Sequence, residues 1–298
     1  MYLTGFADEA AQDLEGQIRA TKALGWNAIE SRQIDGVNIH DLPEADFERA
    51  ARMLDDAGVR VNCFGSAIAN WGKSIDDPFE ITLAEVDRAI PRMQRLGARL
   101  IRIMSYARCD GPDQKAEERF RRLREIVARF RDAGLQPVHE NCMNYGGMSW
   151  RHSLELVENV PGLKLAFDTG NPAISRDHAA PGEALQDPLA FLEHIIDHVA
   201  YVHIKDARLD DGREVFVYPG EGGARIPDVL ARLKAAGYDG GLSIEPHMAA
   251  VFHDPDAGRA SAEESFEIYL EYGRRLAALA TAAGFAARPY APEAMAGL

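Results

Sequence analysis

Four short apolar segments of the chain each carry, at or near their end, a residue that can bind a metal ion or transfer a proton. The segments are PVHEN, KLAFD, YVHIKD and LSIEPH, and the residues are Glu140, Asp168, His203 and Glu245. Three carboxylates and one imidazole form an oxygen and nitrogen ligand set that suits divalent cations. Carboxylates gathered at one point raise each other's pKa, and a divalent cation removes that cost. The set therefore predicts one bound divalent metal ion.

Each of these residues, taken alone, also has a structural explanation. A histidine in a strand is more often a hydrogen-bonded core residue than a ligand. A carboxylate at a strand end often forms a salt bridge or caps a helix, and Asp168 could cap the segment 169–171. The combination favours the metal, because four consecutive strands of the chain each contribute one ligand.

The segment YVHIKD shows how a strand could present such residues. Side chains alternate between the two faces of a strand, so His203 and Lys205 share one face while Val202 and Ile204 share the other. In a parallel α/β barrel, polar residues at the carboxyl end of a strand point into the mouth of the active site. We therefore expect His203 and Lys205 to face that mouth.

Strands and helices alternate along the whole chain, and most helices end in small residues and a glycine that can cap them. We expect strands at 2–8, 28–32, 59–65, 100–106, 136–141, 164–168, 201–206 and 241–245, with helices at 13–24, 44–57, 78–96, 115–133, 149–158, 188–197, 226–236 and 262–283. Eight such units predict a single (β/α)8 barrel with helices outside a parallel sheet. A doubly wound open sheet is the alternative, but the turn after the first strand lacks the GxGxxG pattern.

Composition narrows the class of protein. The chain has 298 residues, close to the length that such a barrel needs, and a net charge of −14 that disfavours nucleic acid and anionic membranes as partners. Three widely spaced cysteines and an N-terminus without signal-peptide character favour the cytoplasm. No apolar run is long enough to span a membrane. We expect a barrel domain at 1–284 and an irregular tail at 285–298.

The segments HENC, FDTGN, HIKDA and LSIEPH resemble the xylose isomerase-like TIM-barrel superfamily, and more narrowly its sugar phosphate isomerase/epimerase branch. The stretch 219–245, with a Pro-Gly-rich loop, a helix and GY-G before the last strand, is similar as well. The branch includes ketose 3-epimerases, hydroxypyruvate isomerase, inosose dehydratase and dehydroshikimate dehydratase. The resemblance extends over nearly the whole chain and implies a metal-dependent enzyme on a (β/α)8 TIM barrel.

The resemblance also implies roles for individual residues. Glu140 and Glu245 would serve both as metal ligands and as the acid and base on opposite faces of the sugar. Asn171 stands where several members have a substrate-binding histidine, which weakens a direct transfer of ketose 3-epimerase activity. Arg208 is the counterpart of an arginine that several members carry shortly after the histidine ligand. The implied cofactor is one divalent ion, with Mn²⁺ expected and Mg²⁺, Co²⁺ or Zn²⁺ as alternatives.

Further polar residues are candidates for binding substrate. Lys205 could hold a substrate oxygen or form a salt bridge to a neighbouring carboxylate, and Trp71 could stack on a sugar ring or pack in the core. Glu221 lies in a glycine-rich loop that could close over substrate or stay in solvent. His247 follows Glu245 by two residues, although Pro246 disturbs the alternation.

Two other predictions concern residues outside this set. Glu30 and Arg32 share a face of the second strand and are expected to pair with each other. His139 should face away from Glu140 and serve a structural role.

These features predict an isomerase or epimerase of a sugar or related polyhydroxylated carbonyl compound, acting by glutamate-mediated proton transfer through a metal-stabilised enediolate. The same enolate could expel a β-hydroxyl, which leaves open a dehydratase acting on an inosose- or dehydroshikimate-like ring. An endonuclease IV-like DNA repair enzyme is a remote alternative, as is a non-catalytic sugar-binding barrel. No run of Arg and Lys marks a phosphate pocket, which favours an unphosphorylated substrate. A homo-oligomer is compatible with the sequence.

Overall fold

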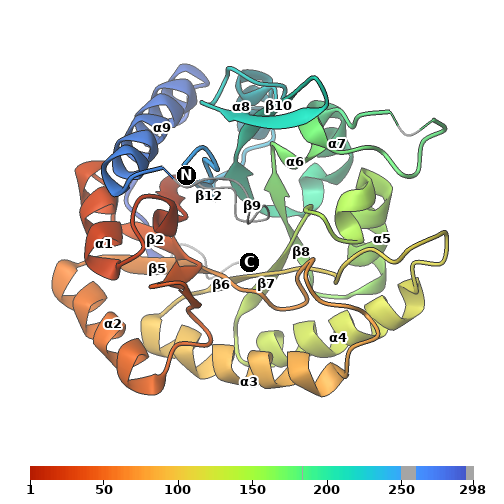
Figure 1. Ribbon diagram of the computed structural model, residues 1–298, viewed down its shortest axis with the longest axis horizontal. Helices are drawn as coiled ribbons and strands as arrows, with labels where there is room; N and C mark the ends of the chain where they lie inside the picture. The colour runs from red at the N-terminus through yellow and green to blue at the C-terminus, as the bar shows by residue number, and fades with distance from the viewer. Residues whose placement is uncertain (183, 250–259, 293–298) are drawn as a thin grey trace.

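A computed structural model describes residues 1–182, 184–249 and 260–292 of the chain. Eight strands form one parallel sheet that curves into a ring (Figure 1). Their order in the sheet is β1 (Tyr2–Gly5), β12 (Gly241–Ile244), β9 (Val199–Ile204), β8 (Lys164–Asp168), β7 (Gln136–Glu140), β6 (Leu100–Ile103), β5 (Arg60–Gly65) and β2 (Ala28–Ser31). A single parallel bridge between Phe6 and Glu30 joins the two edges, so the predicted TIM barrel is confirmed and is nearly closed.

The major helices surround the ring of strands (Figure 1). They are α1 (Leu14–Ala23), α2 (Glu44–Ala57), α3 (Phe79–Leu96), α4 (Ala116–Asp132), α5 (Trp150–Asn159), α7 (Pro188–Ile195), α8 (Ile226–Ala235) and α9 (Ala262–Ala282). Side-chain caps begin several of them, such as Ser261, whose hydroxyl accepts from the N–H of Glu264 while the Glu264 carboxylate accepts from the N–H of Ser261. Gly58 and Gly97 end α2 and α3 in the left-handed conformation that turns the chain towards the next strand.

Two hairpins and several short helices were not predicted. The hairpins are β3 (Gln33–Ile34) with β4 (Val37–Asn38), and β10 (Asp206–Asp210) with β11 (Arg213–Val217); the short helices are η1 (Ala7–Glu9), η2 (Gly146–Met148), α6 (Asn171–Ile174) and η3 (Ile196–His198). Asp211 and Gly212 both have positive φ at the turn between β10 and β11, as an Asp-Gly hairpin turn requires. The seventh barrel strand therefore ends at Ile204, and the predicted end at Asp206 is wrong because that residue begins the hairpin.

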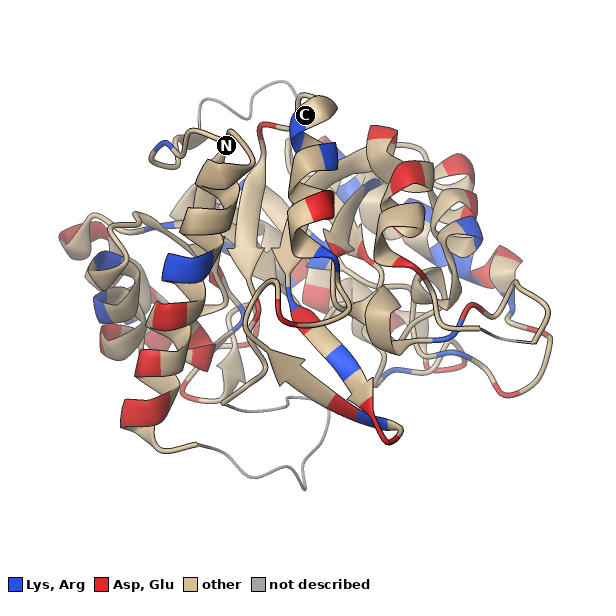
Figure 2. Cartoon of the chain, turned by 90° about the horizontal axis from the view of Figure 1, so that it is seen from above, with Lys and Arg blue, Asp and Glu red and all other residues tan. Residues whose placement is uncertain are grey.

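Two apolar layers hold the barrel together. The larger one lies between the strands and the helices and includes Ile101, Phe167 and Val202. The smaller one includes Tyr2, Val138 and Tyr201, together with Tyr290 from the segment after α9. Acidic and basic residues are interspersed on the surrounding helices (Figure 2). No helix within the described residues is long and apolar enough to cross a membrane.

The predicted tail is described only as far as residue 292. Tyr290 is 4% exposed and packs on Tyr2 with ring centroids 4.8 Å apart. Asn27 accepts from the N–H of Tyr290 and donates to its carbonyl, at 2.8 and 3.0 Å. The part of the tail at 285–292 therefore packs on the barrel near the amino ends of the strands, and residues 293–298 lie outside the described part of the chain.

Candidate metal centre

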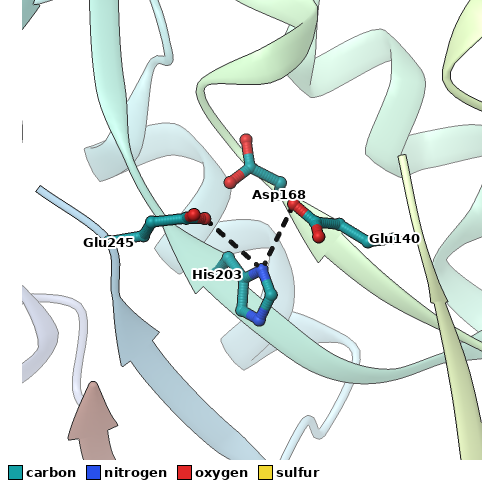
Figure 3. A group of neighbouring side chains, drawn as sticks. All are labelled: Glu140, Asp168, His203 and Glu245. Atoms are coloured by element: carbon teal, nitrogen blue, oxygen red, sulfur yellow. Dashed lines mark ion pairs between the residues drawn. The ribbon is translucent and has the colours of Figure 1, made fainter. Parts of the chain in front are cut away.

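Four buried side chains converge where the strands end. Glu140 and Asp168 are the last residues of β7 and β8, His203 is the penultimate residue of β9, and Glu245 directly follows β12. One ligand atom from each residue lies within 4.8 Å of the corresponding atoms of the others. Figure 3 shows the four side chains pointing towards one another, with ion pairs joining His203 to Glu140 and Glu245. The fold thus brings together all four predicted ligands in a group that could bind a metal ion.

Several ligand atoms in this group make no hydrogen bond within the described part of the chain. They are Asp168 Oδ2, His203 Nδ1 and Glu245 Oε2, and all three are buried. His203 Nδ1 lies 3.6 Å from Glu140 Oε1 and 3.7 Å from Glu245 Oε2. Buried polar atoms are normally hydrogen-bonded. A divalent cation would satisfy these atoms together, so the donor set fits such an ion.

Arg102 sits beside Glu140 on the neighbouring strand β6. Its Nη1 donates to Glu140 Oε2 at 3.0 Å, and both side chains are almost fully buried. Burial alone would raise the pKa of Glu140, but the guanidinium of Arg102 and the ring of His203 lower it to about 2. Glu140 is therefore held as a carboxylate, with Oε2 on the arginine and Oε1 towards His203.

Glu245 has the same kind of arrangement on the opposite side of the group. Arg32 donates from Nη1 to Glu245 Oε1 at 3.2 Å, and His247 Nε2 lies 3.0 Å from the same oxygen. Burial opposes ionisation, yet the charges of Lys205 and His247 hold the pKa of Glu245 well below its usual range. Each of the two glutamates therefore has one oxygen bound by an arginine and one oxygen facing the ligand group.

The carboxylate of Glu30 orients His203 from the Nε2 side of its ring, away from the other three candidate ligands. Its Nε2 lies 3.1 Å from both carboxylate oxygens of Glu30, and Ser243 Oγ donates to Glu30 Oε2 at 2.6 Å. Burial would lower the pKa of His203, but Glu30 and Glu140 raise it well above its usual value. The predicted pairing of Glu30 with Arg32 is wrong, because Arg32 instead contacts Asp8, Glu9 and Glu245.

Asp168 is held by its neighbours on both oxygens. The backbone N–H of Asn171 donates to Oδ1 at 2.7 Å, and Lys205 Nζ lies 3.2 Å from Oδ2. Burial raises the pKa of Asp168 to about 7, although the charge of Lys205 opposes this shift. Lys205 also lies 3.6 Å from Glu245 Oε2. The predicted inward position of Lys205 is therefore what the structure shows, and the lysine bridges two of the four ligands.

A cavity of about 310 Å³ opens above the ligand group. Glu140, Glu245 and Lys205 form part of its wall, and Trp71, Asn171 and His247 line it as well. Its other cationic side chains are Arg32, Arg102, Arg108 and Arg176. The chain has no run of basic residues, but the fold assembles five cations from separate loops and strands around one cavity. Arg32, Arg102 and Lys205 already pair with Glu245, Glu140 and Asp168, so the positive charge beyond these pairs comes from Arg108 and Arg176.

Two predicted substrate-binding residues lie elsewhere among the described residues. Arg208 is exposed on β10, where it pairs in register with Val215, and it is absent from the cavity wall. Glu221 forms an ion pair with Arg275 on α9. Arg208 was expected at the site from the family resemblance, and Glu221 was left open between closing over substrate and staying in solvent. The β10–β11 hairpin directs Arg208 away, and the ion pair holds Glu221 on the helix layer.

The partners of the ligands were missed in the sequence. Arg102 lies in the strand segment LIRI, and an arginine inside a buried strand was a signal that a carboxylate must face it. The partner of Glu30 could not be inferred from β2 alone, because the histidine that it contacts lies 173 residues later in the chain. His139 faces away from Glu140 as predicted: its Nε2 lies 2.9 Å from Ser105 Oγ, and burial lowers its pKa to about 4.

A second group of possible ligands consists of Glu9, Glu245 and His247. Arg32 already occupies it, with Nη2 3.3 Å from Glu9 Oε1 and Nη1 3.2 Å from Glu245 Oε1. The guanidinium supplies the positive charge there. The group of Glu140, Asp168, His203 and Glu245 is therefore the candidate metal centre.

Comparison with known proteins places this geometry in a family. Residues 18–272 match the family described as xylose isomerase-like TIM barrel. A 3-dehydroshikimate dehydratase of Pseudomonas putida is 25% identical over 261 residues, which are 84% of this chain and 40% of that protein. The chain thus spans about two fifths of the length of that relative.

Two solved structures share the fold. A xylose isomerase-like TIM barrel protein of Mycobacterium smegmatis, solved in complex with magnesium, has a TM-score of 0.69 at 15% identity and covers 95% of this chain and 97% of its own. D-allulose 3-epimerase from a Methylomonas species, in complex with D-allulose, has a TM-score of 0.64 at 16% identity, covering 93% of this chain and 96% of its own. At these identities the likeness shows the barrel fold.

Proposed function

The chain belongs to the xylose isomerase-like TIM barrel family, and from that premise we propose that it is a divalent-metal-dependent isomerase or epimerase of a small polyhydroxylated carbonyl compound. The observation that carries this proposal is the convergence of Glu140, Asp168, His203 and Glu245, with three of their ligand atoms buried and without hydrogen bonds in the described part of the chain. Mn²⁺ is the proposed ion, and the magnesium complex of the Mycobacterium smegmatis protein makes Mg²⁺ the first alternative.

The chemistry needs a proton removed from a carbon beside a carbonyl and returned to the same or a neighbouring carbon. A divalent ion at this site would supply polarisation of the carbonyl group. Glu140 and Glu245 lie on opposite sides of the ligand group, and we assign them the roles of base and acid. Arg102 and Arg32 keep these carboxylates ionised, which leaves each of them able to accept a proton.

The other cavity residues position the substrate in this proposal. Lys205 is buried between Asp168 and Glu245, so its ammonium could stabilise an oxyanion that develops near the ligand group. Asn171, Trp71 and His247 line the cavity and supply an amide, an aromatic face and an imidazole for a polyol. We also infer a reducing, cytoplasmic location, which the three free thiols Cys63, Cys109 and Cys142 support.

A dehydratase is the second candidate, and one observation favours it. Arg108 and Arg176 lie on the cavity wall in addition to Arg32, Arg102 and Lys205. Such a lining suits a substrate that carries a carboxylate, as 3-dehydroshikimate does in the relative from Pseudomonas putida. In this candidate the carbanion formed by proton removal expels a β-hydroxyl instead of being reprotonated.

One assay separates the two candidates. The Mn²⁺-loaded protein is incubated in deuterated water with neutral ketoses, inososes and hydroxylated cyclic keto acids. Deuterium at the carbon next to the carbonyl, with no loss of water, supports the isomerase or epimerase. A product that is lighter by one water and absorbs in the ultraviolet supports the dehydratase. Neither outcome across the panel, with metal bound, would contradict the proposed proton-transfer chemistry.

A further inference from the structure

We propose that Glu30 is a positioning residue for the metal centre, whose carboxylate, braced by Ser243, holds the Nε2–H of His203 and so presents Nδ1 to the metal ion. This inference rests on the proposed metal-dependent function and adds two residues to it. Neither residue lines the cavity or touches the space where substrate would bind, as far as the described residues show.

The contacts of Glu30 define its role. Both of its oxygens lie 3.1 Å from His203 Nε2, and Oε2 also accepts from Ser243 Oγ at 2.6 Å. Glu30 and His203 are fully buried. Within the described part of the chain, His203 is the one basic side chain in ion-pair contact with Glu30. A buried carboxylate is costly unless it is paired, and His203 is the basic partner that offsets this cost for Glu30.

Two aromatic rings pack against the ring of His203. Phe6 and Tyr201 contact it edge-on, with ring centroids at 5.1 and 5.5 Å. In this orientation Nε2 faces Glu30, while Nδ1 faces Glu140 and Glu245. A flipped ring would lose the bond to Glu30 and would point a carbon atom at the ligand group.

The tautomer follows from this orientation. A neutral histidine that binds a metal through one nitrogen must carry its proton on the other. Glu30 accepts that proton in a hydrogen bond, and Ser243 fixes the carboxylate by donating to it. Carboxylates that orient a metal-bound histidine in this way typically contribute about 10- to 100-fold to metal affinity. Ser243 contacts Glu30 and not His203, so it contributes through a single hydrogen bond to the carboxylate.

The test measures metal binding without any turnover. Free Mn²⁺ is followed by electron paramagnetic resonance during titration of wild type, Glu30→Gln, Ser243→Ala and the control Glu85→Gln. Glu85 is also a buried carboxylate with a basic partner, Lys73, but it lies on the outer helix α3. We expect Glu30→Gln to weaken Mn²⁺ binding about 10- to 100-fold. Ser243→Ala should weaken it about two- to tenfold, and Glu85→Gln should leave it unchanged.

A second readout reports the tautomer directly. Nitrogen-15 NMR of the histidines in the Zn²⁺-loaded wild type should show His203 protonated at Nε2 and unprotonated at Nδ1. A proton on Nδ1 would overturn the inference even if Glu30→Gln failed to fold, and so would wild-type Mn²⁺ affinity in a folded Glu30→Gln.

The outcomes also separate this inference from the proposed function. Wild-type protein that binds Mn²⁺, together with unaltered binding in Glu30→Gln, would overturn the role of Glu30 and leave the metal-dependent function in place. Wild-type protein that binds no divalent ion would overturn both.

Discussion

The two ends of the barrel differ in their buried side chains, which are charged at the carboxyl ends of the strands and aromatic at the amino ends. At the carboxyl ends of the strands, Glu140, Asp168, His203 and Glu245 bring carboxylates and an imidazole into one buried group, and one facing atom of each of the last three makes no hydrogen bond in the described part of the chain. At the amino ends, Tyr2 and Tyr290 pack within the inner apolar layer with their rings tilted against each other, and Asn27 is hydrogen-bonded to both the N–H and the carbonyl of Tyr290.

The difference shows which parts of the chain serve stability and which serve binding. Packed aromatic rings with satisfied backbone groups lower the free energy of the folded state directly. Buried charges do so poorly, because desolvation offsets their mutual attraction. Buried charges gathered at one end of a barrel therefore suit a bound cation better than they serve stability. Substitutions at the carboxyl ends should abolish chemistry, and substitutions at the amino ends should reduce stability.

The largest expected effect is at the carboxyl ends. Glu140→Gln or Glu245→Gln should reduce turnover about 10³-fold or more, because each removes a ligand and a proton-transfer group together. The measurement is the rate of deuterium incorporation from solvent under saturating Mn²⁺. Full activity in either variant would remove the mechanism with two carboxylates.

The matching change at the amino ends is Tyr290→Ala. Loss of the buried ring should lower the free energy of unfolding by about 3 kcal/mol. Urea denaturation followed by circular dichroism measures this effect. Affinity for Mn²⁺ should remain that of the wild type, and a loss of metal binding would show that the two ends are coupled.

The pH dependence of metal binding sharpens the comparison further. Without metal, burial opposes protonation of His203, but Glu30 and Glu140 raise its pKa well above the usual value, and burial raises that of Asp168 to about 7. A metal ion must displace these protons, so affinity should rise with pH. The rise from pH 6 to pH 8 should be about tenfold or more per unit.

Calorimetry in buffers of different ionisation enthalpy would count the protons released on binding. An affinity for Mn²⁺ that stays constant between pH 6 and pH 8 would contradict the prediction that His203 and Asp168 carry protons in the metal-free protein.

The smallest predicted effect distinguishes a role of Lys205 in substrate binding from a role in metal binding. Lys205→Met should raise KM or lower kcat about tenfold, since its ammonium is assigned to a substrate oxygen, while Mn²⁺ affinity changes less. Kinetics at saturating metal and Mn²⁺ titration of the same preparation give both numbers. Metal loss with a normal substrate response after Mn²⁺ is restored would show that Lys205 acts on the ligands instead.

Much of the fold was predictable because the pattern is local. The helix at 44–57 and the strand at 164–168 have the predicted bounds, since a glycine cap ends the helix and a ligand carboxylate closes the strand. The β10–β11 hairpin was missed, although Asp211-Gly212 between two runs of strand-forming residues is a recognisable turn. The convergence of Glu140, Asp168, His203 and Glu245 was predictable because each lies at or beside the end of its own strand.

The partners of the ligands were not predictable for a different reason. Arg102 contacts Glu140 between the neighbouring strands β6 and β7, and Glu30 contacts His203 across the interior of the barrel. Both pairings depend on strand register and on closure of the barrel, and not on spacing along one segment. The cationic lining of the cavity has the same origin, because Arg108 and Arg176 come from separate loops. Arg208 was expected at the site from the family resemblance, and the β10–β11 hairpin places it away from the cavity wall.

The most direct test of the central claim is metal stoichiometry. Purified protein is treated with a chelator, reloaded with Mn²⁺, freed of excess ion and analysed for metal content, with His203→Ala measured in parallel. About one tightly bound Mn²⁺ per chain in the wild type, lost in the variant, is the predicted result. No retained ion in the wild type, or equal retention in His203→Ala, would contradict a metal centre formed by these four residues.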